Sequence, residues 1–338
     1  MIDYRLNTLE EMDKARRELF AGYKSLRSLE DRSLRDEKNL NKREIRDLIK
    51  KNKKSNEKTY QFLSDCIDKL VESSFKYPEM KNSSHKICEN ELQKTINIYK
   101  EAVNLCNNTD DITHRRDRNY LSNKINKMQD ACDLLNMRAK CDNDKLKPLY
   151  KYVYEMRCIR ADIPEKIDEL FKLENRRING FVQLAGADVN MMIDDKKTKI
   201  VEDCIKMARY AQELTFHGMN DPFAKTEEYD LFKDEVQKAC EVYKAAQARL
   251  AKRVAECEKR PEKAMRDPYF RNADRTLNKG MLNRSIIYSN KSIIYCNELK
   301  DKCKTMQERL IVEVKAAEER RGQKNNIKRN KNAPVMTM

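Results

Sequence analysis

The sequence predicts an all-α protein, built as an elongated bundle of long antiparallel helices with coiled-coil-like packing. Three observations predict this fold. Apolar residues recur at steps of three and four over long stretches. Charged residues make up 38% of the 338 positions, and only six Gly and seven Pro interrupt the chain. A compact globule is about one quarter charged, whereas thin bundles expose more surface per residue.

The first predicted element runs from Leu6 to Lys76, a stretch with no Pro and a single Gly, Gly22. Its apolar stripe thins between about residues 27 and 58, so it is either one long helix or two nearly collinear helices broken near residues 52–56. An unbroken version would measure about 100 Å at 1.5 Å per residue. The apolar residues of its second half are Ile45, Leu48, Ile49, Phe62, Leu63, Cys66, Ile67, Leu70, Val71 and Phe75.

Two shorter helices are predicted next. Tyr77-Pro78 ends the first element, because the residue before proline avoids helical conformation. Asn82 and the two serines after it offer caps for a helix to about Leu105. A polar break follows, and another helix runs from about Thr113 to Lys140.

The middle of the chain predicts a short helix and then a long one. Residues 149–156 alternate tyrosine with other side chains, which is strand-like spacing. We assign a helix because no partner strand is predicted elsewhere. The stretch from Asp162 to Glu165 contains Pro164 and is typical of a helix start, and its helix runs to about Phe216. Gly180 and Gly186 within it each cost about 1 kcal/mol and mark a bend or a close helix approach.

The clearest element lies between Asn220 and Pro261. Asp221 is its predicted N-cap, with Pro222 at the first helical position. Two positions of a seven-residue repeat form its apolar stripe. The first position holds Tyr229, Val236, Tyr243, Leu250 and Cys257, and the second, three residues later in each repeat, holds Phe232, Ala239, Ala246 and Arg253. Small Ala beside bulky Tyr suits packing against unlike helices of the same chain better than a symmetric zipper.

Three regions follow from this pattern: a long-helix bundle over residues 1–160, a second helical bundle over 161–318, and a basic disordered tail over 319–338. The last helix is expected to start near Met281, after a broken and basic stretch. The cations of the tail, a second candidate contact with anions, are Arg320, Arg321, Lys324, Lys328, Arg329 and Lys331.

Charge and cysteine content indicate the kinds of partner and the cellular location to expect. The net charge of +15 favours nucleic acid, anionic lipid or acidic filaments as partners. No apolar run approaches the about 20 residues of a membrane span, and the first residues do not resemble a signal peptide. The eleven Cys are scattered without a CxxC motif, so we expect reduced thiols that act as small hydrophobic residues. The expected location is cytoplasmic, with the nucleus as the alternative.

We expect no enzyme activity. His85 and Cys88 are three residues apart, but a zinc site needs three or four ligands and no second pair has suitable spacing. The acids are spread along helices with Lys and Arg neighbours, so no acid–base pair stands out. Catalytic residues, cofactor-binding residues, metal ligands and a small-molecule substrate are therefore all predicted to be absent.

The most informative functional feature is a basic edge between Asn41 and Tyr60. This stretch contains eight Lys and Arg and three acids, which gives it a net charge of +5. Its cations are Lys42, Arg43, Arg46, Lys50, Lys51, Lys53, Lys54 and Lys58. The edge is interpreted as an anion-binding or partner-binding surface on a long helix, and the competing interpretation is an ordinary solvated helix face.

Three functions remain open at this point. The first is a non-enzymatic structural or scaffold protein that acts through coiled-coil-like helical surfaces, with other proteins as partners and with self-association into a homo-oligomer. The second is a BAR-like peripheral membrane-binding or curvature module that uses basic helix faces, an analogy of architecture alone. The third is binding to nucleic acid or a cytoskeletal filament through the basic edge and the tail.

Overall fold

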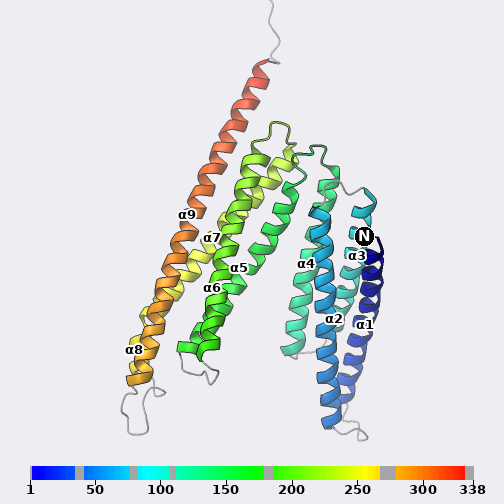
Figure 1. The fold of residues 1–338 in the computed structure, drawn as a ribbon, viewed down its shortest axis with the longest axis vertical. Helices are drawn as coiled ribbons and strands as arrows, with labels where there is room; N and C mark the ends of the chain where they lie inside the picture. The colour runs from blue at the N-terminus through cyan, green and yellow to red at the C-terminus, as the bar shows by residue number, and fades with distance from the viewer. Residues whose placement is uncertain are drawn as a thin grey trace, which may run out of the picture. The chain divides into compact units, whose positions relative to one another are not determined.

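The computed structural model describes residues 2–34, 42–76, 82–106, 112–178, 186–266 and 279–331. Those residues form helices joined by turns, and none of them lies in a strand, so the all-α class is confirmed (Figure 1). Internal contacts divide the chain into two compact units, Met1–Lys151 and Tyr152–Met338.

The first unit is built from long helices that each bury one apolar face. They are α1 (Ile2–Leu34), α2 (Lys42–Lys76), α3 (Asn82–Cys106) and α4 (Ile112–Lys140). Leu19 of α1, Leu63 of α2 and Leu92 of α3 are fully buried. Leu134 of α4 is fully buried as well, so all four helices contribute to the core of this unit.

α1 and α2 pack side by side as an antiparallel hairpin, so the predicted single rod or collinear pair is wrong. Asn52 donates a hydrogen bond to the Ser25 hydroxyl (3.1 Å). A Cβ added to Gly22 would lie 2.0 Å from Oδ1 of the buried Asn56. The connection at residues 35–41 lies outside the described residues. The hairpin is favoured because it buries the apolar stripes of both helices, which an isolated rod would leave in water.

Polar side chains join the other helices of the first unit to α2. The Tyr99 hydroxyl of α3 donates to the Tyr60 carbonyl (3.0 Å). Arg138 of α4, only 2% exposed, donates to the Ser74 carbonyl near the end of α2 (2.6 Å). A cation at a helix C-terminus satisfies a carbonyl and complements the helix dipole.

α5 runs without a break from Leu149 to Ile178 and contains Pro164. The helix start predicted at Asp162 is therefore wrong, whereas helix over residues 149–156 is confirmed. An internal proline costs about 3 kcal/mol. Here Ile163 and Ile167, both 1% exposed, continue the buried face past the proline, and their burial offsets that cost.

The helix predicted from Asp162 to Phe216 is in fact an antiparallel pair, α5 and α6 (Gly186–Glu213). Arg177 near the end of α5 donates to Asn190 near the start of α6 (2.9 Å). Gly180 lies outside the described residues, and Gly186 is the first residue of α6. The chain thus reverses direction between the end of α5 at Ile178 and the start of α6 at Gly186, which the continuous apolar pattern concealed.

α6 leads through the π-helix η1 (Leu214–Met219) into a turn and then α7 (Thr226–Glu258). Asp221 is not the N-cap of α7, in contrast to the prediction. Its carboxylate accepts a hydrogen bond from the Phe223 N–H (2.7 Å) and stabilises the turn. Lys225 is the cap residue, and its N–H donates to Glu228 (2.8 Å).

The two heptad lines of α7 form its buried face, as predicted. All nine of their residues, including Arg253, are buried. α7 packs antiparallel against α9 (Lys279–Lys331) of the same unit. Lys233 pairs with Glu318 (2.7 Å), and Gln247 bonds to Gln307 (2.8 Å).

The basic C-terminal segment is helical where a disordered tail was predicted. After the short α8 (Arg260–Arg266), α9 continues without interruption to Lys331. Residues 320–331 are mostly Arg, Lys, Asn and Gln, with Gly322 as the weakest helix former. Arg, Lys and Gln have good helix propensity, so a helix anchored by its packed first part continues outward although its apolar stripe has ended.

Candidate anion-binding surface

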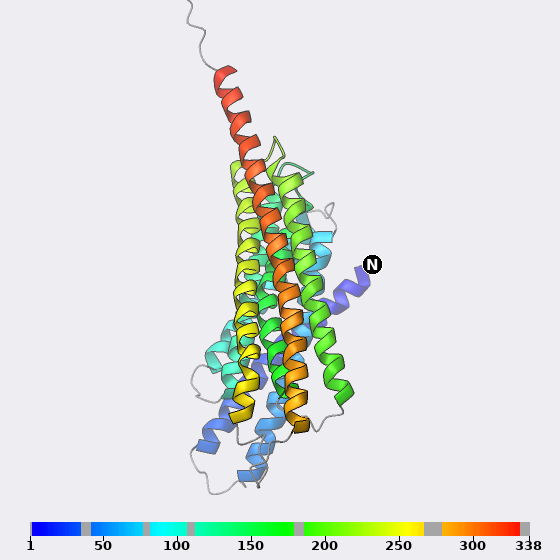
Figure 2. The same cartoon turned by 90° about the vertical axis from the view of Figure 1, so that its left-hand side faces the viewer.

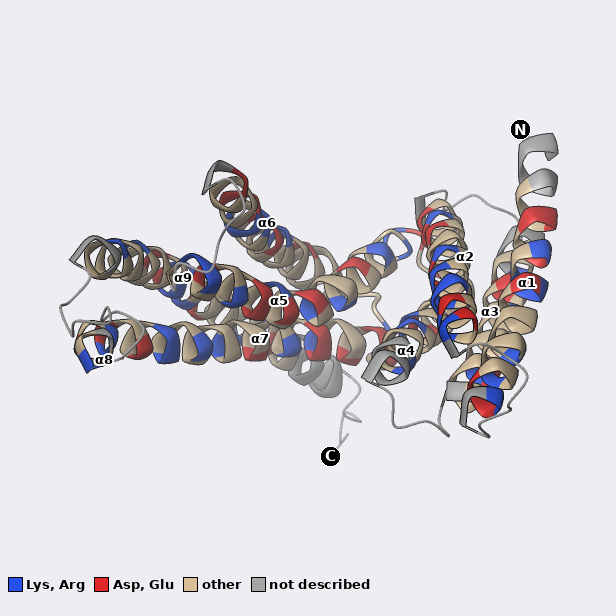
Figure 3. Ribbon diagram, turned by 90° about the horizontal axis from the view of Figure 1, so that it is seen from below, with Lys and Arg blue, Asp and Glu red and all other residues tan. Residues whose placement is uncertain are grey.

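Four exposed cations form a row along α2 that winds gradually around the helix. Arg46, Lys50, Lys54 and Lys58 follow one another at steps of four residues, and all four are exposed. Each step rises about 6 Å along the helix, so the row is about 18 Å long. We call this row the α2 ridge; Figure 3 colours the Lys and Arg residues of α2 blue.

The packing of α2 fixes the direction of the ridge. Ile45, Asn56 and Tyr60 are buried, with exposures of 4%, 3% and 7%. Because Asn56 contacts α1 at Gly22, α2 cannot rotate about its axis without disrupting that close approach. The ridge therefore stays on the solvent side.

The ridge is a concentration of positive charge with little internal compensation. In the part of the chain that the structure describes, none of its four residues forms an ion pair. Like charges at i, i+4 destabilise a helix by about 0.2–0.5 kcal/mol per pair. Asp47 and Glu57 are exposed on the same helix and reduce the repulsion. An anion bound along the ridge would remove more of it, which makes this row suited to an acidic ligand.

The remaining cations of the predicted basic edge are not equivalent. Lys51 is exposed, whereas Lys53 is half-buried and lies 3.4 Å from Glu30 of α1, so Lys53 stabilises the hairpin. Arg43 is exposed and has an interaction of its own. The side chain of Lys42 lies outside the described residues. The structure thus brings four of the eight together in one row, at a spacing that a simple charge count does not reveal.

Two apolar residues of α2 lie on the surface, in contrast to the predicted stripe. Leu48 is 47% exposed and Phe62 is 40% exposed. Lys51 lies three residues after Leu48, Lys58 lies seven residues after Lys51, and Phe62 lies four residues after Lys58. These helical steps place all four residues on one side of α2. Sequence periodicity missed this surface because apolar residues at helical spacing are assigned to the core.

The C-terminal cations, like those of the basic edge, are not equivalent. Arg320 donates to the side-chain oxygen of Asn220 (3.3 Å), and the Arg321 guanidinium lies 3.8 Å from the centre of the Tyr229 ring. The side chains of Lys324, Lys328, Arg329 and Lys331 lie outside the described residues. The first two therefore hold α9 against the end of η1 and the start of α7.

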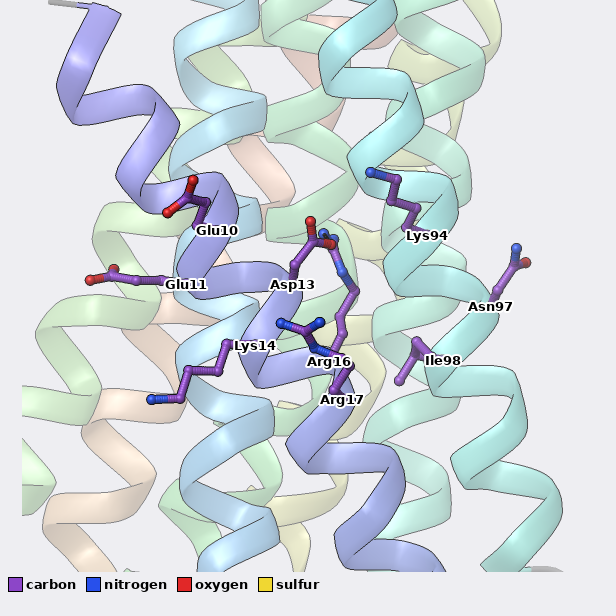
Figure 4. A pocket seen from close by; sticks show the side chains of 9 residues that line it. All are labelled: Glu10, Glu11, Asp13, Lys14, Arg16, Arg17, Lys94, Asn97 and Ile98. Atoms are coloured by element: carbon purple, nitrogen blue, oxygen red, sulfur yellow. Dashed lines mark hydrogen bonds and ion pairs between the residues drawn. The ribbon is translucent and has the colours of Figure 1, made fainter.

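An open groove of about 910 Å³ lies between α1 and α3 (Figure 4). Arg16 at its base is 4% exposed; it pairs with Glu91 (2.6 Å) and Asp13, and donates to Thr95 (3.1 Å). The Arg16 guanidinium holds the pKa of Asp13 below its ordinary value. These contacts satisfy the buried charges, so we interpret the groove as the surface of a structural ion-pair network.

Most described cysteines are buried, and burial raises the pKa of several thiols. The pKa of Cys88 is raised to about 11 and that of Cys132 to about 12, chiefly by desolvation. Both thiols stay protonated at neutral pH, when they are poor nucleophiles and metal ligands. Within the described ranges, no three or more His, Cys, Asp and Glu gather in a way that could hold a metal ion.

The fold and the α2 ridge have no counterpart that assigns a family. No family model, curated protein or solved structure matches the chain. Among the helices in the described residues, none has the length and apolar character needed to cross a bilayer.

Proposed function

We propose that the chain is a non-enzymatic helical scaffold that binds an acidic protein partner along the α2 ridge. The observation that carries this proposal is the row of four exposed cations on a helix whose opposite face is buried. The row repeats about every 6 Å. Carboxylates at i, i+4 on an acidic helix repeat at the same distance, so the two rows match along their length.

The surroundings of the ridge favour a protein over a uniform polyanion. Asp47 and Glu57 interrupt the positive surface, which penalises a phosphate backbone but sets the register of a partner with mixed charges. The exposed Phe62, four residues after Lys58, offers the apolar contact that protein interfaces bury. Nucleic acid is the alternative that the duplex DNA arm of the binding experiment tests, and an acidic cytoskeletal filament is one form of acidic protein partner.

The proposal includes an elongated bundle with coiled-coil-like packing that self-associates. Ile287 and Ile294 of α9 support it, because they are 52% and 59% exposed and lie seven residues apart on one side of the helix. Light scattering with small-angle X-ray scattering tests this part. We expect the wild type to be an elongated oligomer and the variant with Ile287→Glu and Ile294→Glu to be a monomer. A compact wild-type monomer would rule out self-association.

Binding to a model acidic polypeptide tests the ridge. The probe is fluorescein-labelled poly-L-glutamate, followed by anisotropy at low salt. The ridge variant carries Arg46→Glu, Lys50→Glu, Lys54→Glu and Lys58→Glu. The control carries the same number of reversals at exposed lysines elsewhere: Lys199→Glu, Lys206→Glu, Lys244→Glu and Lys252→Glu.

We expect the ridge variant to bind about tenfold more weakly or worse, because exposed charge pairs contribute about 0.2–1 kcal/mol each and reversal makes each contact repulsive. The control should stay within about threefold of wild type, since only its net charge has changed. Equal losses in both variants would show that net charge alone drives binding. Tighter, equally ridge-dependent binding of duplex DNA would assign the ridge to nucleic acid instead.

A further inference from the structure

A second surface lies in the second unit, where η1 joins α6 to α7. Phe216 of η1 is 65% exposed, and Phe223 in the turn that follows is 81% exposed. A soluble protein exposes large apolar side chains singly without consequence. Two phenylalanines this exposed within eight residues, beside a rare π-helix, call for a functional explanation.

The backbone that carries these phenylalanines is firmly held. Leu214 and Met219 of η1 are buried. A Cβ added to Gly218 would lie 2.5 Å from the ring of Phe232 in α7, so η1 packs against α7 as closely as a glycine permits. The Phe223 N–H is bonded to the Asp221 carboxylate (2.7 Å). The exposure of the two rings is therefore a property of a packed turn.

The basic end of α9 is fixed beside the same turn. Arg320 donates to Asn220 (3.3 Å), and Arg321 stacks on Tyr229. From Arg320 onward the chain has six Lys and Arg and no Asp or Glu. Figure 2 shows the last turns of α9 continuing past the connection between α6 and α7.

Acidic residues near this turn reduce its positive charge, but they do not cancel the positive charge at the end of α9. Glu213 lies 3.6 Å from His217, and Glu318 pairs with Lys233 (2.7 Å). Glu227 near the start of α7 is exposed. The uncompensated positive charge of the sequence thus begins at Arg320, and Arg320 and Arg321 fix this part of α9 to Asn220 and Tyr229, close in sequence to the two phenylalanines.

We propose that this end of the second unit docks on an anionic phospholipid surface. Phe216 and Phe223 enter the boundary between headgroups and acyl chains, where aromatic side chains are favoured. The cations of α9 that follow Arg321 contact the anionic headgroups. The site combines a modest apolar insertion with a polybasic segment, the pair of signals that stable peripheral binding requires.

Lipid is favoured over single-stranded nucleic acid by the arrangement of the groups. Base stacking requires aromatic rings interleaved with the phosphate-binding cations. Here Phe216 and Phe223 are on the turn, and the cations are on a separate helix. The proposal is independent of the α2 ridge.

The absence of Trp from the chain provides a direct reporter. Phe216→Trp and Phe223→Trp each create a protein with a single Trp at the proposed contact. With vesicles of phosphatidylcholine and phosphatidylserine, we expect a blue shift of the emission and quenching by brominated acyl chains. Pure phosphatidylcholine should give little response. Ile205→Trp, at another exposed apolar position, is the matched control and should not respond.

Vesicle flotation provides the second measurement. The pair Phe216→Ser and Phe223→Ser should lower the partition coefficient about tenfold, as should Lys324→Glu with Lys328→Glu. Met191→Ser with Ile205→Ser, at other exposed apolar positions, should leave it within about threefold, as should the control reversals Lys199→Glu, Lys206→Glu, Lys244→Glu and Lys252→Glu. Circular dichroism verifies that each variant is folded. Unresponsive Trp reporters, or a response to duplex DNA instead of vesicles, would overturn the proposal, as would equal loss of flotation in the control variants.

Discussion

Arg253 and Glu174 form an ion pair in the core of the second unit, 3.3 Å apart, with side chains 2% and 0% exposed. The same carboxylate accepts a hydrogen bond from Ser292 (2.5 Å) and lies 3.3 Å from Lys197. One acid therefore connects α5, α6, α7 and α9. Because buried charges tolerate few alternative partners, this network specifies which helices meet.

The Arg253–Glu174 pair should make a large contribution to stability. Arg253→Met leaves the Glu174 carboxylate buried without its guanidinium partner, so the free energy of unfolding should fall by about 3–5 kcal/mol. Arg249→Met is the matched control, because its pair with Asp168 is exposed and such pairs contribute about 1 kcal/mol or less. Urea unfolding measures both variants. Similar losses would show that the buried network is not special.

Two glycines should respond to alanine in opposite directions. Gly218→Ala places a Cβ 2.5 Å from the Phe232 ring and should destabilise the protein by about 1–3 kcal/mol. Gly322 in α9 has no atom within 4 Å of the added Cβ, so Gly322→Ala should stabilise its helix by about 1 kcal/mol or less. Thermal unfolding tests the pair. Tolerance of Gly218→Ala would disprove the tight packing of η1 on α7.

The α1–α2 hairpin has its own test at Gly22. Gly22→Leu should destabilise the first unit by about 1–3 kcal/mol, because even a Cβ there would lie 2.0 Å from Oδ1 of Asn56 and the buried amide would have to move aside. Asn56→Gly should restore part of the stability of a Gly22→Ala protein, since it removes the atom in contact. Denaturant unfolding of the single and double variants gives the coupling. Additive effects would indicate that the two helices do not meet there.

Stability should decline at alkaline pH. Burial raises the pKa of Cys88 to about 11, so the folded chain keeps this proton while the unfolded chain releases it above about pH 8.5. The unfolded state then binds fewer protons, and the free energy of unfolding falls between about pH 9 and 11. Between pH 8 and 10, Cys88→Ala should lose about 2 kcal/mol less than wild type in urea. Parallel losses would show that this thiol is not responsible.

Local patterns predicted the faces of individual helices better than the turns between them. The α7 stripe was predictable because nine residues repeat at heptad spacing and meet one neighbouring surface. Pro164 was misread as a helix start because local propensity favours a break, while burial of Ile163 and Ile167 on both sides favours continuation. Asp221 has the chemistry of a cap, yet it stabilises a turn instead.

The candidate sites were also predictable from the sequence only in part. Counting Lys and Arg located the basic edge of α2, because charge density is a property of the sequence. The special role of Lys53 depends on Glu30 of another helix, which no local pattern reveals. Phe216 and Phe223 could not be recognised as surface residues, since their exposure depends on how η1 packs against α7. The buried position of Glu174 is likewise a consequence of tertiary packing.

The central claim is that a rigid row of cations on α2 forms the binding surface, and chemical footprinting tests it most directly without changing the sequence. Lysines are acetylated by an amine-reactive reagent with and without bound poly-L-glutamate, and mass spectrometry gives each rate. We expect Lys50, Lys54 and Lys58 to react several-fold more slowly in the complex, because their ammonium groups are paired. The exposed control lysines, Lys199, Lys206, Lys244 and Lys252, should keep their rates. Equal protection of both sets, or none at the ridge, would contradict the account.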